Sequence, residues 1–166
     1  MDLLRRENSP EDSKLIKENI MTLKIKKLRP GAIIPKRATK NSAGLDVHAC
    51  IDKPVEIPVG EIRNFPIGIA VAPDCDDVVM LMFPRSGLGR SKGISLPNCV
   101  GVIDSDYRGE IQVPLINHGR EPYTVLPGEK IAQLVTVPVI FPDVEETDTL
   151  SKTDRGEAGF GSSGKF

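Results

Sequence analysis

Two aspartates, Asp104 and Asp106, lie two positions apart in the segment Asn98 to Glu110. An aspartate has a reference pKa of about 3.9, so it is ionised at neutral pH and can orient and deprotonate a water molecule. The segment reads as strand, tight turn and strand, with a hairpin expected at Ser105 and Asp106. A turn that merely ends two strands explains the same residues, so this segment alone leaves both interpretations open.

A segment rich in glycine and basic residues, Phe83 to Gly93, continues from the longest apolar stretch of the chain. Ser86 is expected to cap a short helix, its hydroxyl accepting a hydrogen bond from a backbone N–H. Free N–H groups at a helix start, flanked by Arg85, Arg90 and Lys92, attract an anion, and an arginine can hold two phosphate oxygens at once. No Walker phosphate-binding loop is present, and a polar turn with solvated basic residues is the alternative.

Two polar residues stand in apolar, strand-like contexts. Gln133 lies within Gly128 to Val135, where a buried amide needs hydrogen-bond partners or faces a ligand. Asp46 lies within Ser42 to His48 and could accept structural hydrogen bonds, pair with an arginine or anchor a metal indirectly. For both residues a structural role is the simpler interpretation of the local sequence.

The C-terminal segment Arg155 to Gly164 combines glycines with an arginine, the ring of Phe160 and the hydroxyls of Ser162 and Ser163. Backbone N–H groups and hydroxyls can wrap phosphate oxygens, while the arginine neutralises charge and the aromatic side chain stacks on a ring. The same composition is typical of a flexible tail. Both a phosphate-binding lid and a disordered tail are therefore open here.

The composition indicates which scaffold positions these segments. The chain has 166 residues, 39% hydrophobic and 27% charged, with a net charge of −1, as in a soluble globular domain. This balance excludes a strongly basic nucleic-acid-binding protein, and no apolar run is long enough to span a membrane. The 14 prolines and 15 glycines disfavour long helices and favour many short strands joined by turns.

Apolar runs and alternation predict an all-β sandwich or barrel of short strands with one short helix. Three regions are expected: a polar N-terminal extension over 1–21, a β domain over 22–150 and a flexible C-terminal arm over 151–166. Within the extension, residues 11–21 could form an amphipathic helix. The expected strands are 22–28, 55–59, 67–72, 78–83, 111–116 and 131–140.

The cysteines and histidines disfavour several chemistries. Cys50, Cys75 and Cys99 are widely separated and form no CxxC pair, so a zinc site is not expected. Their odd number, without a signal peptide, indicates reduced thiols and a cytoplasmic location. The only histidines, His48 and His118, are not spaced for a Ser-His-Asp hydrolase.

Taken in order, the five segments resemble the five ordered motifs of the trimeric all-β dUTPase family, the deoxyuridine triphosphate nucleotidohydrolases. The resemblance runs from Thr22 to Gly164, and five weak motifs with fitting order and spacing are together specific. Leu45 stands where the family frequently has tyrosine, Ala158 where glycine is usual and Ser163 where threonine is usual. None of these departures removes a group that the chemistry needs.

The resemblance implies a dUTPase-like β-barrel or jelly-roll-type sandwich that hydrolyses dUTP to dUMP and pyrophosphate, lowering dUTP and supplying dUMP for thymidylate synthesis. It implies that Asp104 orients the water that attacks the α-phosphorus, that Tyr107 packs under the deoxyribose and that Asp46 supports the site. Mg²⁺ would be held by the triphosphate and water, not by protein ligands. The residues expected to hold the nucleotide are Arg85, Ser86, Gly87, Asn98, Gly101, Val102, Ile103, Tyr107, Gln112, Gln133, Arg155, Phe160, Gly161, Ser162 and Ser163.

The resemblance also implies a homotrimer with shared active sites. The first, second and fourth motifs would come from one subunit, the third from another and the fifth from a third, with no nucleic acid or membrane partner. Two alternatives remain. One is a dCTP deaminase-like enzyme, disfavoured because Pro114 occupies the place of its glutamate. The other is a non-catalytic nucleotide-binding or regulatory relative.

Overall fold

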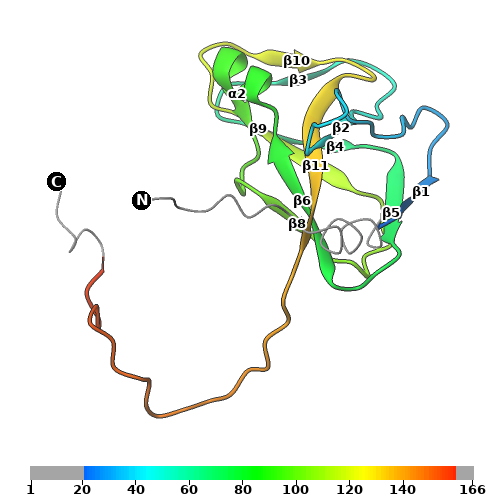
Figure 1. Cartoon of the computed structure of the whole chain (residues 1–166). Coiled ribbons are helices and arrows are strands. Elements are labelled where there is room, and N and C mark those ends of the chain that lie inside the picture. Colours follow the sequence, from blue (N-terminus) through cyan, green and yellow to red (C-terminus); the bar gives the residue numbers. More distant parts are fainter. Residues whose placement is uncertain (1–20, 160–166) are drawn as a thin grey trace, which may run out of the picture.

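Short strands dominate the described part of the chain, and one helical segment, α2, interrupts them there (Figure 1). The structure is a computed structural model that describes residues 21–159. The all-β architecture with one short helix is confirmed in this part of the chain. Its elements are β1 Leu23–Lys27, β2 Leu45–His48, β3 Val55–Ile57, β4 Ile62–Pro66, β5 Ile69–Pro73, β6 Val78–Pro84, α2 Ser86–Lys92, β7 Ile94–Ser95, β8 Gly101–Ile103, β9 Gln112–Asn117, β10 Tyr123–Val125 and β11 Lys130–Pro138.

Every strand pairing in the described chain is antiparallel, and the strands form four small sheets. The largest sheet has the order β2-β11-β6-β8, and a second sheet has the order β4-β9-β7. The strands β1 and β5 form one two-stranded ribbon, and β10 and β3 form another. Because β11 lies between β2 and β6, three segments that are far apart in the sequence meet at one end of the largest sheet.

The core is formed by apolar side chains that alternate along the strands. In β6, Met80 and Met82 are buried, whereas Val79 and Leu81 on the other face are only half-buried. The strand expected over 78–83 is confirmed as β6, and its side chains are buried on one face only. Alternation places the second face outside the core, so β6 leaves apolar surface uncovered by its own chain.

The hairpin expected at Ser105 and Asp106 is wrong as a pairing of two neighbouring strands. The strand before the turn, β8, pairs with β6, while the strand after it, β9, pairs with β4 and β7. The tight turn itself is present, because the backbone N–H of Tyr107 donates to the carbonyl of Asp104 at 3.1 Å. The segment thus crosses from one sheet to another, and its turn forms part of a cavity wall.

The chain beyond β11 leaves the body of the molecule (Figure 1). Its backbone contact with the body is a hydrogen bond from Val139 N–H to the carbonyl of Asp77, at 2.9 Å. Residues 139–159 form no helix or strand. This segment begins before the C-terminal arm predicted over 151–166 and is called the arm below. The helix considered for 11–21 and the end of the tail from Phe160 onward lie outside the described residues. No helix in the described chain is long and apolar enough to cross a membrane.

Candidate active site

The strand register brings together Asp46, Arg85 and Gln133, which belong to three separate sequence motifs. In β11, Gln133 is opposite Asp46 of β2 on one side and Phe83 of β6 on the other. Arg85 follows the end of β6 directly. This arrangement follows from the central position of β11, and it places a carboxylate, a guanidinium and an amide at one end of the sheet.

Asp46 lies between two cations. Its Oδ1 is 3.3 Å from Nε of Arg85 and its Oδ2 is 2.8 Å from Nζ of Lys130. Burial raises the pKa of the carboxyl, but the hydrogen bond from Lys130 and the two positive charges outweigh it and hold the pKa of Asp46 below its ordinary value. Arg85 also donates from Nη1 to the backbone carbonyl of Lys130, at 3.1 Å. The guanidinium is therefore fixed from two directions.

The variant Asp46→Asn is expected to lower the free energy of unfolding by about 1–2 kcal/mol at pH 7. Because folding lowers the pKa of this carboxyl, its contribution is full above the unfolded pKa of about 4 and is lost as the pH falls through the lower folded value. Thermal unfolding of both proteins from pH 7 to pH 2 measures this. A difference in Tm that is equal at both ends of the range would contradict the ion-pair assignment.

The side-chain amide of Gln133 is held in place by neighbouring residues. Its Nε2 donates to the carbonyl of Pro84 at 3.0 Å, which links β11 to the end of β6. A side chain at Gly44 would meet the amide oxygen and Cβ of Gln133, so glycine at this position gives the amide its space. The amide thus has a structural partner, and it also lies beside the Asp46–Arg85 pair.

Helix α2 begins at Ser86, but Ser86 does not cap it. The capping position is Arg85, in extended conformation, and no side chain makes a capping hydrogen bond. Arg90 and Lys92 lie in the last turn, where cations complement the carbonyl end of a helix. The expectation that they flank the helix start is wrong, because they lie at the other end of a helix of seven residues, which is about 10 Å long. Ser86 and Gly87 are exposed beside Arg85.

A second group of predicted residues lines a cavity of about 250 Å³. The ring of Tyr107 packs over Gly109, where any side chain would collide with it. The hydroxyl of Tyr107 donates to the carbonyl of Glu110 at 3.2 Å, and Arg108 donates to the carbonyl of Ser105 at 2.6 Å. These contacts hold the turn in shape. The lining residues are Val102, Ile103, Asp104, Tyr107, Glu110, Ile111 and Gln112.

Within one chain, Asp104 and Arg85 lie at opposite ends of β6. The register pairs Gly101 with Met82 and Ile103 with Met80, so β8 runs away from Arg85 toward the start of β6. Asp104 follows β8 and is exposed. Six strand positions separate the level of Asp104 from that of Arg85, which corresponds to roughly 20 Å. A single chain therefore does not bring Asp104 to the Asp46–Arg85 pair.

The remaining predicted residues occupy separate places. Gly101 packs against Met82, since a Cβ at this position would lie 3.1 Å from the Met82 Cβ, and exposed Asn98 lies nearby. Arg155 is exposed in the arm, where its Nε donates to the carbonyl of Ala158 at 2.8 Å. The predicted contacts at Phe160, Gly161, Ser162 and Ser163 lie outside the described residues.

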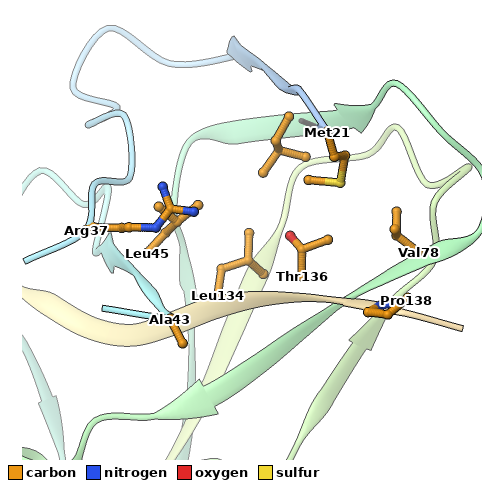
Figure 2. A pocket seen from close by; sticks show the side chains of 9 residues that line it. Met21, Arg37, Ala43, Leu45, Val78, Leu134, Thr136 and Pro138 are labelled. Carbon is orange, nitrogen blue, oxygen red and sulfur yellow. The ribbon is translucent and has the colours of Figure 1, made fainter. Parts of the chain in front are cut away.

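Another cavity lies along the second half of β11, where Leu134, Thr136 and Pro138 line it (Figure 2). It has a volume of about 430 Å³ and is lined mainly by apolar side chains, including Met21, Leu45 and Leu134. Arg37 is the single charged residue among its lining residues in the described chain. None of the predicted site residues lines this cavity, so it is distinct from the candidate active site.

Sequence reasoning missed three charged residues of the site. Lys130 binds Asp46, and Arg29 forms an ion pair with Glu110, which lines the cavity that also contains Tyr107. Lys130 had one available signal, since it lies within the segment that contains Gln133. Arg29 and Glu110 are 81 positions apart, and nothing in their local sequence connects them.

Comparison with known proteins gives consistent matches over most of the chain. A family model described as dUTPase matches residues 31–164. The deoxyuridine 5'-triphosphate nucleotidohydrolase of Escherichia coli O9:H4 is 44% identical over 132 residues, covering 80% of this chain and 87% of that protein. The structure of Staphylococcus bacteriophage 80alpha dUTPase with dUPNHPP is 27% identical with a TM-score of 0.78, covering 86% of this chain and 98% of that one. A phage phi11 dUTPase, described with a structural Mg(II) ion, is 23% identical with a TM-score of 0.69, covering 77% and 97%.

Proposed function

The chain belongs to the dUTPase family and is a dUTP-hydrolysing enzyme, and we propose that water attacks the α-phosphate to give dUMP and pyrophosphate. The observation that carries this proposal is the 44% identity to a deoxyuridine triphosphate nucleotidohydrolase over 80% of the chain. The product dUMP would serve thymidylate synthesis. A cytoplasmic location stays a prediction from the sequence.

Asp104 is the proposed general base. It is exposed at the rim of the cavity that Tyr107 and Gln112 also line, so its carboxylate is free to orient a water molecule beside a bound nucleotide. The cavity would hold the uracil and deoxyribose, with the ring of Tyr107 under the sugar. Positioned base catalysis of this kind contributes about 10²- to 10⁴-fold to a rate.

The Asp46–Arg85 pair and its neighbours are the proposed phosphate site. A triphosphate carries several negative charges, and Arg85 is held by Asp46 and by the Lys130 carbonyl with its remaining donors available. A guanidinium fixed in advance binds phosphate with little further loss of side-chain freedom. Exposed Ser86 and Gly87, next to it, would add donors to the same oxygens.

A site shared between copies of the chain accounts for the separation of Asp104 from the Asp46–Arg85 pair. We propose that Asp104 of one subunit meets Arg85 of another in a homotrimer. The half-buried face of β6 supports this, because Val79, Leu81 and Val102 line a groove of about 810 Å³ together with Phe141. The carboxylates of Asp76, Asp104 and Asp106 line the same groove. Val102 is 66% exposed, and exposed apolar surface of this kind marks protein interfaces.

The arm supports the same proposal. Ile140, Phe141, Val144 and Leu150 are 72–95% exposed on a segment that leaves its own body, so they have apolar surface to bury on another subunit. The arm would then carry Arg155 to a neighbour's active site. There the C-terminal segment from 151 onward would close over the nucleotide.

Mg²⁺ is the proposed cofactor. In the described part of the chain, no three or more His, Cys, Asp or Glu side chains are grouped so that they could hold a metal ion. Asp46 is already paired with Arg85 and Lys130, so Mg²⁺ would be carried by triphosphate oxygens and waters. When bound, the ion supplies neutralisation of the triphosphate charge.

The proposed reaction is tested by supplying the purified chain and Mg²⁺ with dUTP, dCTP, UTP or dTTP in separate assays. Pyrophosphate released from dUTP alone is the expected result. A uracil nucleotide formed from dCTP would instead indicate a deaminase. Binding of dUTP without any product would indicate a regulatory relative.

A further inference from the structure

Arg29 and Glu110 form an ion pair with two parallel hydrogen bonds. The Nε atom of Arg29 lies 2.6 Å from Oε1 of Glu110, and Nη2 lies 2.8 Å from Oε2. This pairing joins the loop after β1 to the wall of the nucleotide cavity, across 81 positions of sequence. Fork-to-fork contacts of this kind fix geometry as well as adding energy.

Glu110 is linked to two cavity residues through separate groups. Its backbone carbonyl accepts the hydrogen bond from the hydroxyl of Tyr107 at 3.2 Å, and its Oε2 accepts one from Nε2 of Gln112 at 3.3 Å. Tyr107 and Gln112 both line the cavity. The position of Glu110 therefore determines where an aromatic ring and an amide lie.

The exposure of the pair indicates that overall stability is not its main effect. The side chains of Arg29 and Glu110 are 48% and 20% exposed, and exposed ion pairs contribute little to folding. The hydrogen bond from Arg29, the largest influence, holds the pKa of Glu110 below its ordinary value, so the carboxylate stays charged and paired at neutral pH. The ion pair therefore acts mainly on the local geometry of the cavity wall.

We propose that Arg29 is a positioning residue for nucleotide selection: it fixes Glu110 and thereby the wall formed by Tyr107 and Gln112. A fixed ring under the sugar excludes the 2′-hydroxyl of a ribonucleotide more strictly than a ring that can shift. The inference rests on the proposed function, in which this cavity holds the sugar and base. Arg29 touches no substrate and acts through Glu110 alone.

The test compares kcat/KM for dUTP and UTP in the wild type and in Arg29→Met. The preference for dUTP is expected to fall about tenfold, mainly through a higher KM for dUTP and faster turnover of UTP. A misplacement of about 1 Å in a site can cost about 10²-fold, and the loss of one supporting contact is expected to shift the wall by less. Glu110→Leu is expected to give the same loss. The exchanged pair Arg29→Glu with Glu110→Arg is expected to recover part of the preference.

Arg63→Met is the matched control. Arg63 pairs with Glu61 at 3.3 Å with both side chains exposed, and this pair has no contact with the cavity, so the preference is expected to stay unchanged. If Arg29→Met does not fold, Arg29→Lys replaces it, since lysine keeps the charge without the planar fork.

Tyr107→Ala distinguishes a failure of the positioning role of Arg29 from a failure of the assignment of the cavity to the nucleotide. If Tyr107→Ala lowers the preference for dUTP while the folded Arg29 variants leave it unchanged, the positioning role of Arg29 is overturned and the site assignment stands. If Tyr107→Ala also leaves the preference unchanged, the assignment of the cavity fails, and the inference fails with it.

Discussion

Replacing Asp104 with asparagine is expected to lower kcat for dUTP at least about a hundredfold while the affinity for the nucleotide is retained. The amide keeps the size of the side chain but cannot accept a proton from water. Asp104 lies at the rim of the cavity, so its loss leaves the Tyr107 wall intact. Steady-state kinetics, with a binding measurement on a non-hydrolysable dUTP analogue, separate the two effects.

Asp106→Asn is the control for this prediction. Asp106 is also exposed and lies two positions further along the same turn, but it does not line the cavity that holds Tyr107. It is therefore expected to retain most of the activity. Unchanged turnover in Asp104→Asn would refute Asp104 as the base, and a matching loss in both variants would point to the turn as a whole.

Deletion of residues 154–166 is expected to reduce kcat/KM at least about a hundredfold, because it removes Arg155 and the segment proposed to close over the triphosphate. The trimer is expected to persist, because the apolar residues Ile140, Phe141, Val144 and Leu150 all precede the deletion. Enzyme kinetics and light scattering on the same sample measure both properties.

Arg155→Ala keeps the chain at full length and tests the charge alone. Arg155→Ala is expected to lower kcat/KM for dUTP, but by less than the deletion does. A monomer after the deletion would show that the tail is structural and would overturn its assignment as a lid.

Much of the fold was predictable because β6 and β11 are long and apolar, with seven and nine residues. Strands such as β7 and β10, with two and three residues, are too short to show an alternation of apolar and polar residues. The pairing of β8 was not predictable either. Its turn suggested a local hairpin, but the apolar surface of β6 offered the better partner, and that contact depends on tertiary packing.

The site was predictable as a set of motifs but not as a geometry. Local sequence identified Asp46, Arg85 and Gln133, and the sheet register then brought them together. The Arg29–Glu110 pair could not be predicted, because its members lie in unrelated loops. The separation of Asp104 from Arg85 also depends on strand order, which no single segment encodes.

Mixed trimers test the shared site most directly. Asp104→Asn and Arg85→Gln chains carrying different tags are co-expressed and purified over both tags, so every trimer contains both variants. Each variant alone is expected to be nearly inactive. In a cyclic trimer of both, one site combines an intact Asp104 with an intact Arg85, so about a third of wild-type activity is expected. Mixed trimers as inactive as their parents would contradict a site built from two chains.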